Sequence, residues 1–173
     1  MRSLKYSVAA SLDGYIAGPN GEFDWIVVDD EIDFTEMYRG FSGLVMGRKS
    51  YEVFVATGGA PGLTLPTYVY SRSLPEGERD GISFMHDAVP HVRKLKAEDG
   101  DGKPLWLWGG GELFRQLAEA DLVDAVEVAI IPVILGEGLQ LLPSPGPRLP
   151  LRLKTHRLFR QTGTILVEYE VVR

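Results

Sequence analysis

The sequence predicts a three-layer α/β protein, in which helices cover both faces of a mostly parallel central sheet with antiparallel strands at its C-terminal edge. Short apolar runs alternate with segments of helical spacing along most of the chain. The chain then ends in two strand-like runs joined by Thr162-Gly163, which is a hairpin turn signal. No repeat or linker interrupts the 173 residues, so we expect one domain over residues 1–173.

In the first half of the chain, apolar runs bounded by turn residues predict strands, and i, i+3, i+4 spacing predicts helices. One helix is expected over residues 29–41 and another after Gly47, and residues 58–66 are rich in helix breakers. The strands are expected over residues 4–11, 15–17, 44–46 and 67–71. The apolar faces of the two helices carry Phe34, Met37, Tyr38 and Phe41, and then Tyr51, Phe54 and Val55.

In the second half, Asp87 is a candidate N-cap for a third helix, and three glycines precede a fourth. Four prolines exclude regular structure from residues 143–150. The strands are expected over residues 82–85, 105–108, 125–131, 151–160 and 164–172. The apolar faces of the two helices carry Val89, Val92 and Leu95, and then Leu113, Phe114, Leu117 and Ala118.

Composition excludes several classes of function. The chain has no cysteine, which rules out disulfides, zinc-thiolate sites and cysteine nucleophiles. Its net charge of −6 argues against nonspecific nucleic-acid binding. No apolar run is long enough to span a bilayer, and the N-terminus lacks a signal-peptide pattern, so we expect a cytoplasmic protein with no membrane partner. The three histidines lack metal-ligand spacing, so no metal site is expected.

Three turns that follow predicted strands predict a nucleotide site. Gly47 to Ser50 and Gly109 to Gly111 each open a helix, and Ser71-Arg72 follows a third strand. In parallel sheets ligands bind beyond the carboxyl ends of the strands. Helix N-termini attract anions, and glycine lets a phosphate approach the backbone. Neither the G-x-G-x-x-G motif nor the Walker motif occurs, so the standard Rossmann and P-loop interpretations fail.

Five blocks together resemble the dihydrofolate reductase superfamily, and within it the branch that includes the reductase domain of bacterial riboflavin biosynthesis. They occur in family order and cover most of the chain. The resemblance implies an NADPH-dependent reductase, and by analogy with the riboflavin branch a homodimer. The blocks are S-L-D-G-Y-I-A (11–17), M-G-R-K-S-Y-E (46–52), V-Y-S-R (69–72), W-G-G-G-E-L (108–113) and L-V-D-A-V-E-V-A-I-I-P-V-I-L-G-E-G (122–138).

By position, the resemblance assigns the cofactor contacts. Ser71 and Arg72 would take the 2′-phosphate, and the backbone of the first strand region would contact the nicotinamide carboxamide. The residues implied for the pyrophosphate and adenosine are Gly47, Arg48, Lys49 and Ser50. The residues implied for the other phosphate and ribose contacts around the glycine turn are Trp108, Gly109, Gly110, Gly111, Glu112 and Leu113. The residues implied for the carboxamide are Ala9, Ile16 and Ala17.

Hydride transfer to a C=N bond is helped by a carboxylate that orients or supplies a proton. Residues 22–36 contain seven acids and no base. Counting back from Gly47 points to Glu31, counting forward from Trp25 points to Asp30, and a shifted register allows Asp33. Alternatively, most of these acids form a solvated first turn of a helix, where negative charge is favourable. The substrate pocket is expected to include Trp25, Phe34 and Phe114.

The sequence therefore predicts a reductase that transfers a hydride to a C=N or C=O bond of a small heterocycle of the pteridine or pyrimidine type. The acidic segment disfavours a phosphorylated substrate, because like charges repel. Two alternatives stay open: an aminopyrimidine reductase of riboflavin biosynthesis, and a nucleotide-binding module without catalysis.

Overall fold

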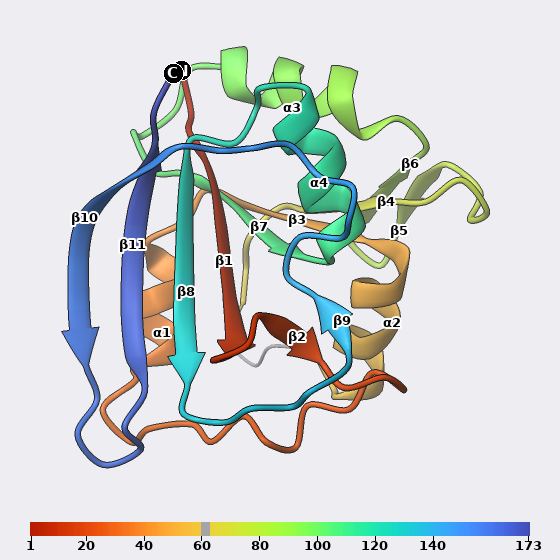
Figure 1. Ribbon diagram of the computed structural model, residues 1–173. Coiled ribbons are helices and arrows are strands. Elements are labelled where there is room, and N and C mark those ends of the chain that lie inside the picture. Colours follow the sequence, from red (N-terminus) through yellow and green to blue (C-terminus); the bar gives the residue numbers. More distant parts are fainter. Residues whose placement is uncertain (60–62) are drawn as a thin grey trace.

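The computed structural model describes residues 1–59 and 63–173, so part of the predicted breaker-rich segment 58–66 lies outside the described residues (Figure 1). The main sheet has the strand order β10-β11-β8-β1-β7-β3-β4-β6-β5, and β2 and β9 form a separate pair. The strands are β1 (Leu4–Ser11), β2 (Tyr15–Ala17), β3 (Gly43–Gly47), β4 (Thr67–Tyr70), β5 (Gly77–Arg79), β6 (Ile82–Met85), β7 (Leu105–Gly109), β8 (Ala125–Ile131), β9 (Leu139–Gln140), β10 (Leu151–Leu158) and β11 (Ile165–Val171).

The central strands from β8 to β6 pair in parallel, which confirms the predicted sheet. β11 pairs antiparallel with β8, and β10 pairs antiparallel with β11, as the hairpin signal at Thr162-Gly163 indicates. The first strand, β1, lies between β7 and β8 in the middle of the sheet. Its side chains therefore form the centre of both sheet faces.

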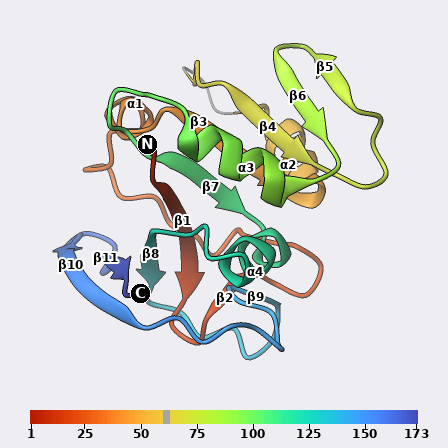
Figure 2. The same cartoon turned by 90° about the horizontal axis from the view of Figure 1, so that it is seen from above.

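Helices cover both faces of the sheet (Figures 1 and 2). On one face α3 (Ala88–Ala97) and α4 (Gly111–Glu119) pack over a core that includes Leu105 and Leu107. On the other face α1 (Phe34–Arg39) and α2 (Arg48–Ala56) contribute to a smaller cluster around Trp106. Since side chains alternate along a strand, β7 supplies both cores.

The first helix is shorter than the segment 29–41 that the spacing predicts. Asp33 caps its N-terminus by accepting a hydrogen bond of 3.0 Å from the backbone N–H of Glu36. The preceding residues form a turn instead, in which Ile32 donates its N–H to the carbonyl of Asp29 at 3.0 Å. Asp29 and Asp33, which the spacing places inside the helix, therefore form the turn and the cap that precede it.

The short strands β5 and β9 have no counterpart in the sequence-based prediction. β9 has two residues and pairs with β2 through Tyr15–Gln140 and Ala17–Leu139. Neither strand has the apolar alternation that marks a longer strand. The β2–β9 pair holds residues 15–17 beside the end of β1, at the edge of the cleft described below.

Within residues 1–59 and 63–173, no helix is long and apolar enough to cross a membrane. The same residues contain no cluster of three or more His, Asp or Glu side chains that could hold a metal ion.

Candidate active site

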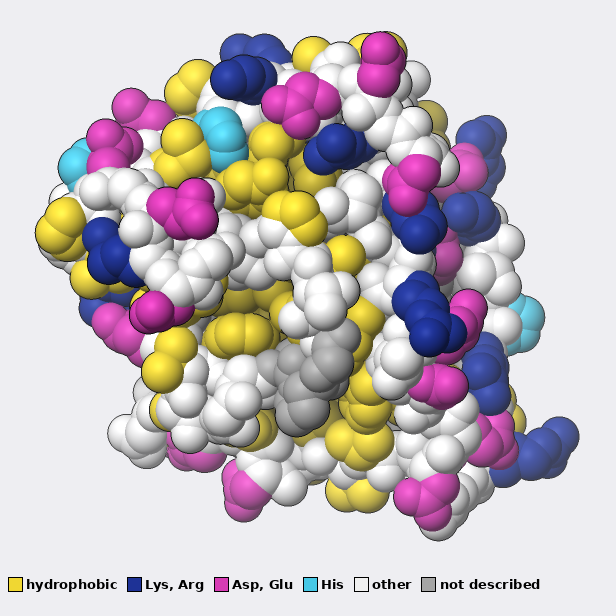
Figure 3. Space-filling model, turned by 180° about the vertical axis from the view of Figure 1, so that it is seen from behind, with side chains coloured by type: hydrophobic (Ala, Val, Ile, Leu, Met, Phe, Trp, Pro, Cys, Tyr) yellow, Lys and Arg dark blue, Asp and Glu magenta, His cyan; other side chains and the backbone are white. Residues whose placement is uncertain are grey.

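A cleft of about 2180 Å³ opens on the sheet face that carries α1 and α2. Its floor is formed by β1, β7 and β8, and its far wall by the segment from Gly21 to Tyr38. Figure 3 shows hydrophobic side chains in a hollow on one face of the molecule, with charged side chains gathered along one side. The cleft is larger than the ~300–1,000 Å³ that is usual for one small ligand.

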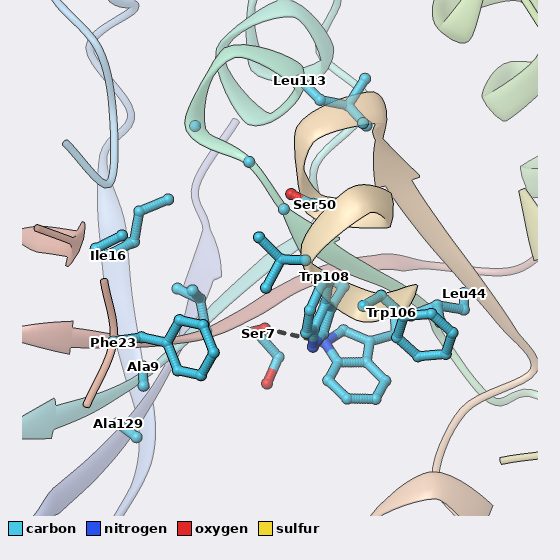
Figure 4. Close-up of a pocket in the computed structure, with 18 of the residues that line it drawn as sticks. Ser7, Ala9, Ile16, Phe23, Leu44, Ser50, Trp106, Trp108, Leu113 and Ala129 are labelled. Atoms are coloured by element: carbon cyan, nitrogen blue, oxygen red, sulfur yellow. Dashed lines mark hydrogen bonds between the residues drawn. The ribbon is translucent and has the colours of Figure 1, made fainter. Parts of the chain in front are cut away.

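The floor of the cleft is built by strand alternation. Every second residue of β1 faces the cleft, beginning with Lys5 and continuing through Ser7 and Ala9. In β8 the matching positions are Glu127 and Ala129, which pair in register with Ser7 and Ala9. Figure 4 shows Ser7 between Ala9 and the indoles of β7. The side chains on the floor are thus small and apolar at one end of the cleft and polar further along.

Two glycine turns meet at one end of the cleft. Gly47 is the N-cap of α2 and Gly110 is the N-cap of α4. A Cβ built at Gly47 would lie 3.8 Å from the carbonyl oxygen of Gly109, so the two turns are in contact distance. Neither cap residue has a side chain to bond the first helical N–H groups, which leaves them for another partner. The Gly109–Gly110 peptide bond is cis.

The basic and hydroxyl residues predicted around these turns also line the cleft. They are Arg48, Lys49, Ser50, Ser71 and Arg72. Arg48 forms an ion pair with Glu52 one turn along α2. The Ser71 hydroxyl accepts hydrogen bonds from the backbone N–H groups of Ser73 and Leu74, at 3.2 and 3.0 Å, and so shapes its own turn.

The remaining predicted cofactor positions lie in the same cleft. Glu112 is paired with Arg115 at 2.8 Å, on the outer side of α4. Leu113 faces both the cleft and the core under α4. The other lining residues of this group are Ala9, Ile16, Ala17, Gly47, Trp108, Gly109, Gly110 and Gly111.

The structure separates the acids of residues 22–36. Glu31 lines the cleft but forms a 2.8 Å ion pair with Arg157. Asp30 is not among the residues that line the cleft, and its carboxylate accepts a 3.4 Å hydrogen bond from Gln161, so the structure does not bring Asp30 into the cleft. Asp33 also lines the cleft, but its carboxylate caps α1, as described above.

Two of the three predicted substrate-pocket residues do not line the cleft. Phe114 is buried under α4 and stacks on Tyr6 with ring centroids 4.1 Å apart, on the opposite sheet face from the cleft. Trp25 does not line the cleft, and its indole N–H donates to the carbonyl of Glu22 at 3.2 Å. Phe34 does line the cleft. The helical pattern of 113, 114, 117 and 118 marks a core face, which explains the position of Phe114.

Sequence reasoning missed the polar floor of the cleft. Ser7 donates a 2.7 Å hydrogen bond to Glu127, and Lys5 lies 3.4 Å from the same carboxylate. Trp106 donates its indole N–H to the carbonyl of Ser7 at 2.9 Å (Figure 4). The available signal was Glu127, the one charged residue in the apolar strand 125–131. A lone charge in a central strand needs a partner or a function.

The strand order and the helices on both sheet faces define a dihydrofolate reductase-like α/β fold. A dihydrofolate reductase from Enterococcus faecalis, solved with NADP(H), superposes with a TM-score of 0.71 at 17% identity over 99% of this chain and 97% of that chain. A Shewanella sp. PV-4 protein provisionally assigned to riboflavin biosynthesis superposes with a TM-score of 0.82 at 22% identity over the whole of both chains.

Residues 2–166 match the RibD C-terminal domain, and the chain belongs to this family. A bifunctional deaminase/reductase from Thermotoga maritima, named for an aminopyrimidine deaminase and a uracil-type reductase, superposes with a TM-score of 0.71 at 18% identity over 99% of this chain and 57% of that chain. The Bacillus subtilis protein YyaP is 30% identical over 97% of this chain and 94% of its own length. Family and neighbours together support an oxidoreductase.

Proposed function

We propose that this protein is an NADPH-dependent reductase that transfers a hydride to a C=N or C=O bond of a small pteridine- or pyrimidine-like heterocycle. The contact between the two glycine turns at one end of the cleft carries this proposal. Two helix N-termini with unbonded N–H groups suit a pyrophosphate, because both present positive partial charge to one point. We assign this role to the turns at Gly47 and Gly109 to Gly111.

The residues that flank these turns suit the rest of the cofactor. Lys49 and Ser50 would bind the adenosine side and its phosphates together with Arg48. The Arg72 guanidinium, beside the turn held by Ser71, suits a 2′-phosphate dianion, because arginine binds phosphate with two parallel N–H bonds. Cofactor chemistry would supply the hydride, from C4 of the reduced nicotinamide.

The nicotinamide would lie at the small, apolar end of the floor. Ala9 and Ala129 are in register there, and their methyl groups leave room for a flat ring. The backbone of Ile16 and Ala17, held by the β2–β9 pair, lies at the same edge of the cleft. Main-chain amides and carbonyls in this position would fix the carboxamide and so orient the ring.

The substrate would occupy the remaining space between the floor and the segment that includes Phe34. The cleft volume of about 2180 Å³ accommodates a dinucleotide with a second ligand beside it. Glu31 is the acid of the segment 22–36 that we retain as a candidate for orienting a proton, since it lines the cleft and, unlike Asp33, does not cap a helix. Its partner Arg157 would hold it at the rim.

Membership of the RibD C-terminal domain family favours a second candidate, an aminopyrimidine reductase of riboflavin biosynthesis. The two candidates share the cofactor and differ in the substrate. A nucleotide-binding module without catalysis would bind the same cofactor but would reduce no substrate.

Titration with NADPH and NADH, followed by nicotinamide fluorescence, tests the cofactor. We expect binding of NADPH with tighter affinity than NADH, and the absence of binding of either would refute the proposal. Turnover is then followed at the nicotinamide absorbance with dihydrofolate, a dihydropterin and an aminopyrimidine that carries a ribosylamino phosphate. Turnover of the aminopyrimidine alone selects the riboflavin reaction, and binding without turnover of any carbonyl or imine substrate selects the non-catalytic module.

A further inference from the structure

A row of polar side chains runs across the sheet at right angles to the strands, and part of it lies on the floor of the cleft. Ser7 in β1 pairs in register with Glu127 in β8, which pairs in register with Glu168 in β11. Lys5, two residues before Ser7, lies 3.4 Å from the carboxylate of Glu127 and 3.1 Å from that of Glu168. Two carboxylates directly opposite each other on neighbouring strands repel, so the lysine between them is required.

The charges of the row are largely withdrawn from water. The side chains of Lys5 and Glu127 are each 16% exposed, and that of Glu168 is 9% exposed. Lys154 lies 2.8 Å from Glu168 and brings the formal charge of the row to zero. Burial acts to raise the pKa of Glu168, but hydrogen bonds from Lys154 and Lys5 outweigh it and lower that pKa. Glu168 is thus a charged partner held within the sheet.

Glu127 differs from Glu168 in what it faces. Lys5, Ser7 and Glu127 line the cleft, whereas Glu168 does not. A carboxylate has about four lone-pair positions. The contacts with Ser7 and Lys5 use one position on each oxygen of Glu127. Each oxygen of Glu127 therefore has a further lone-pair position that can accept a hydrogen bond from a ligand. The hydrogen bond from the Ser7 hydroxyl fixes the orientation of the Glu127 carboxylate.

The distance to the hydride site suits a second ring. Glu127 and Ser7 are two residues from Ala129 and Ala9 on the same face, which is about 7 Å along the strands. A flat substrate that stacks against a nicotinamide over the two alanines would reach Glu127 with its edge. Glu31 is placed less well, because it is 54% exposed and paired with Arg157 at the rim.

We propose that Glu127, oriented by Ser7 and neutralised by Lys5, is the carboxylate that anchors the substrate through a pair of adjacent N–H groups. This inference rests on the proposed function for the position of the nicotinamide. It places a substrate-binding carboxylate on the sheet floor, apart from the proton-orienting acid that the sequence predicts in the segment 22–36. The site selects planar ligands with an amidine-like edge, because such an edge donates two parallel hydrogen bonds to a carboxylate.

The test uses benzamidine, a planar amidinium, and benzamide, its neutral analogue of similar shape. The ¹⁵N–¹H signal of the Trp106 indole reports on the site, because this N–H donates to the carbonyl of Ser7. The Trp25 indole, which does not line the cleft, is the reference signal. We expect benzamidine to shift the Trp106 signal and to bind more tightly than benzamide.

Glu127→Gln should weaken benzamidine binding about tenfold or more, as expected when a charge-assisted pair is lost. Glu168→Gln is the matched control, because it removes the same charge from the same row outside the cleft, and it should change binding less than twofold. Ser7→Ala should weaken binding several-fold by releasing the orientation of Glu127. If Glu127→Gln does not fold, as judged by the dispersion of its amide signals, Ser7→Ala decides the question.

Absence of a Trp106 shift in the wild type, or equal losses in Glu127→Gln and Glu168→Gln, would overturn the anchor. NADPH titration of the same proteins separates the two proposals. NADPH binding that is unchanged in Glu127→Gln, together with lost benzamidine binding, supports both. A wild type that binds benzamidine through Glu127 but does not bind NADPH refutes the proposed function and leaves the anchor standing.

Discussion

The carboxylate of Asp29 accepts two hydrogen bonds from Thr162, one from its backbone N–H and one from its hydroxyl, each 3.1 Å long. The same carboxylate accepts the backbone N–H of Glu31 at 3.0 Å, and Asp29 is 1% exposed. Asp29 thereby joins the wall of the cleft to the turn between β10 and β11. The acid at this position is structural, although it belongs to the segment in which a catalytic acid was sought.

Asp29→Ala should lower the melting temperature by several degrees, because it leaves the backbone N–H groups of Thr162 and Glu31 without their side-chain acceptor. Asp30→Ala is the matched control, since Asp30 is exposed and has one long hydrogen bond to Gln161. Thermal unfolding followed by circular dichroism measures both variants. Equal melting temperatures for Asp29→Ala and Asp30→Ala would show that the link to Thr162 does not stabilise the wall.

The contribution of Asp29 should also depend on pH. The backbone N–H of Glu31 is the main cause that lowers the pKa of Asp29, assisted by Thr162 and Arg157 against the opposing effect of desolvation. A lowered pKa in the folded state stabilises the protein above the pKa of the unfolded chain, which is near 3.8 for Asp. This stabilisation is lost as the pH falls through the folded-state pKa. The difference in stability between wild type and Asp29→Asn should therefore shrink below about pH 4.

Gly111→Ala should destabilise the protein by about 1–3 kcal/mol. A Cβ at this position would lie 2.6 Å from the carbonyl oxygen of Gln140 and 2.8 Å from the ring of Pro143. Gly47→Ala is the control, because its Cβ would meet only ordinary contacts at 3.8 Å or more. Denaturant unfolding compares the two. A loss in Gly47→Ala as large as that in Gly111→Ala would contradict a steric cause.

The sequence predicted the sheet and its helices because strand alternation and helical spacing are local signals. The positions of Gly47 and Gly109 to Gly111 at strand-to-helix turns were also predictable, since each follows an apolar run and precedes a segment of helical spacing. The acids of residues 22–36 were harder to place. Asp29 and Thr162 are far apart in the chain. No local pattern shows that one of the seven carboxylates in this segment accepts hydrogen bonds from so distant a residue.

The polar floor could not be assigned from the sequence for a related reason. Ser7 and Glu127 become neighbours only through the parallel register of β1 and β8. Phe114 shows the opposite error, in which a residue near a predicted site turned toward the other core. Which face of the sheet a helix covers depends on the connection between strands, and side-chain spacing alone does not reveal it.

We expect the protein to form a homodimer, as its family resemblance implies, and the edge strand β10 is the candidate contact. β10 pairs with β11 on one side, and all of its residues are exposed, including Leu153 at 52%. Exposed edge strands with apolar side chains favour pairing with another chain. Light scattering should give twice the 19.1 kDa chain mass. Leu153→Lys should yield monomer, while Val55→Lys, an equally exposed site on α2, should not.

Arg72→Ala should weaken NADPH binding by about 10- to 100-fold, the loss expected for a charged hydrogen bond to phosphate, and NADH binding by less than twofold. Arg72 lines the cleft directly after Ser71, whose hydroxyl bonds hold the turn in place without the arginine. The variant should therefore keep its fold and lose the contact with the 2′-phosphate alone. Arg79→Ala is the control, because Arg79 stacks on Phe84 and does not line the cleft. Fluorescence titration with both cofactors measures the ratio, and equal losses for NADPH and NADH would remove Arg72 from the 2′-phosphate site.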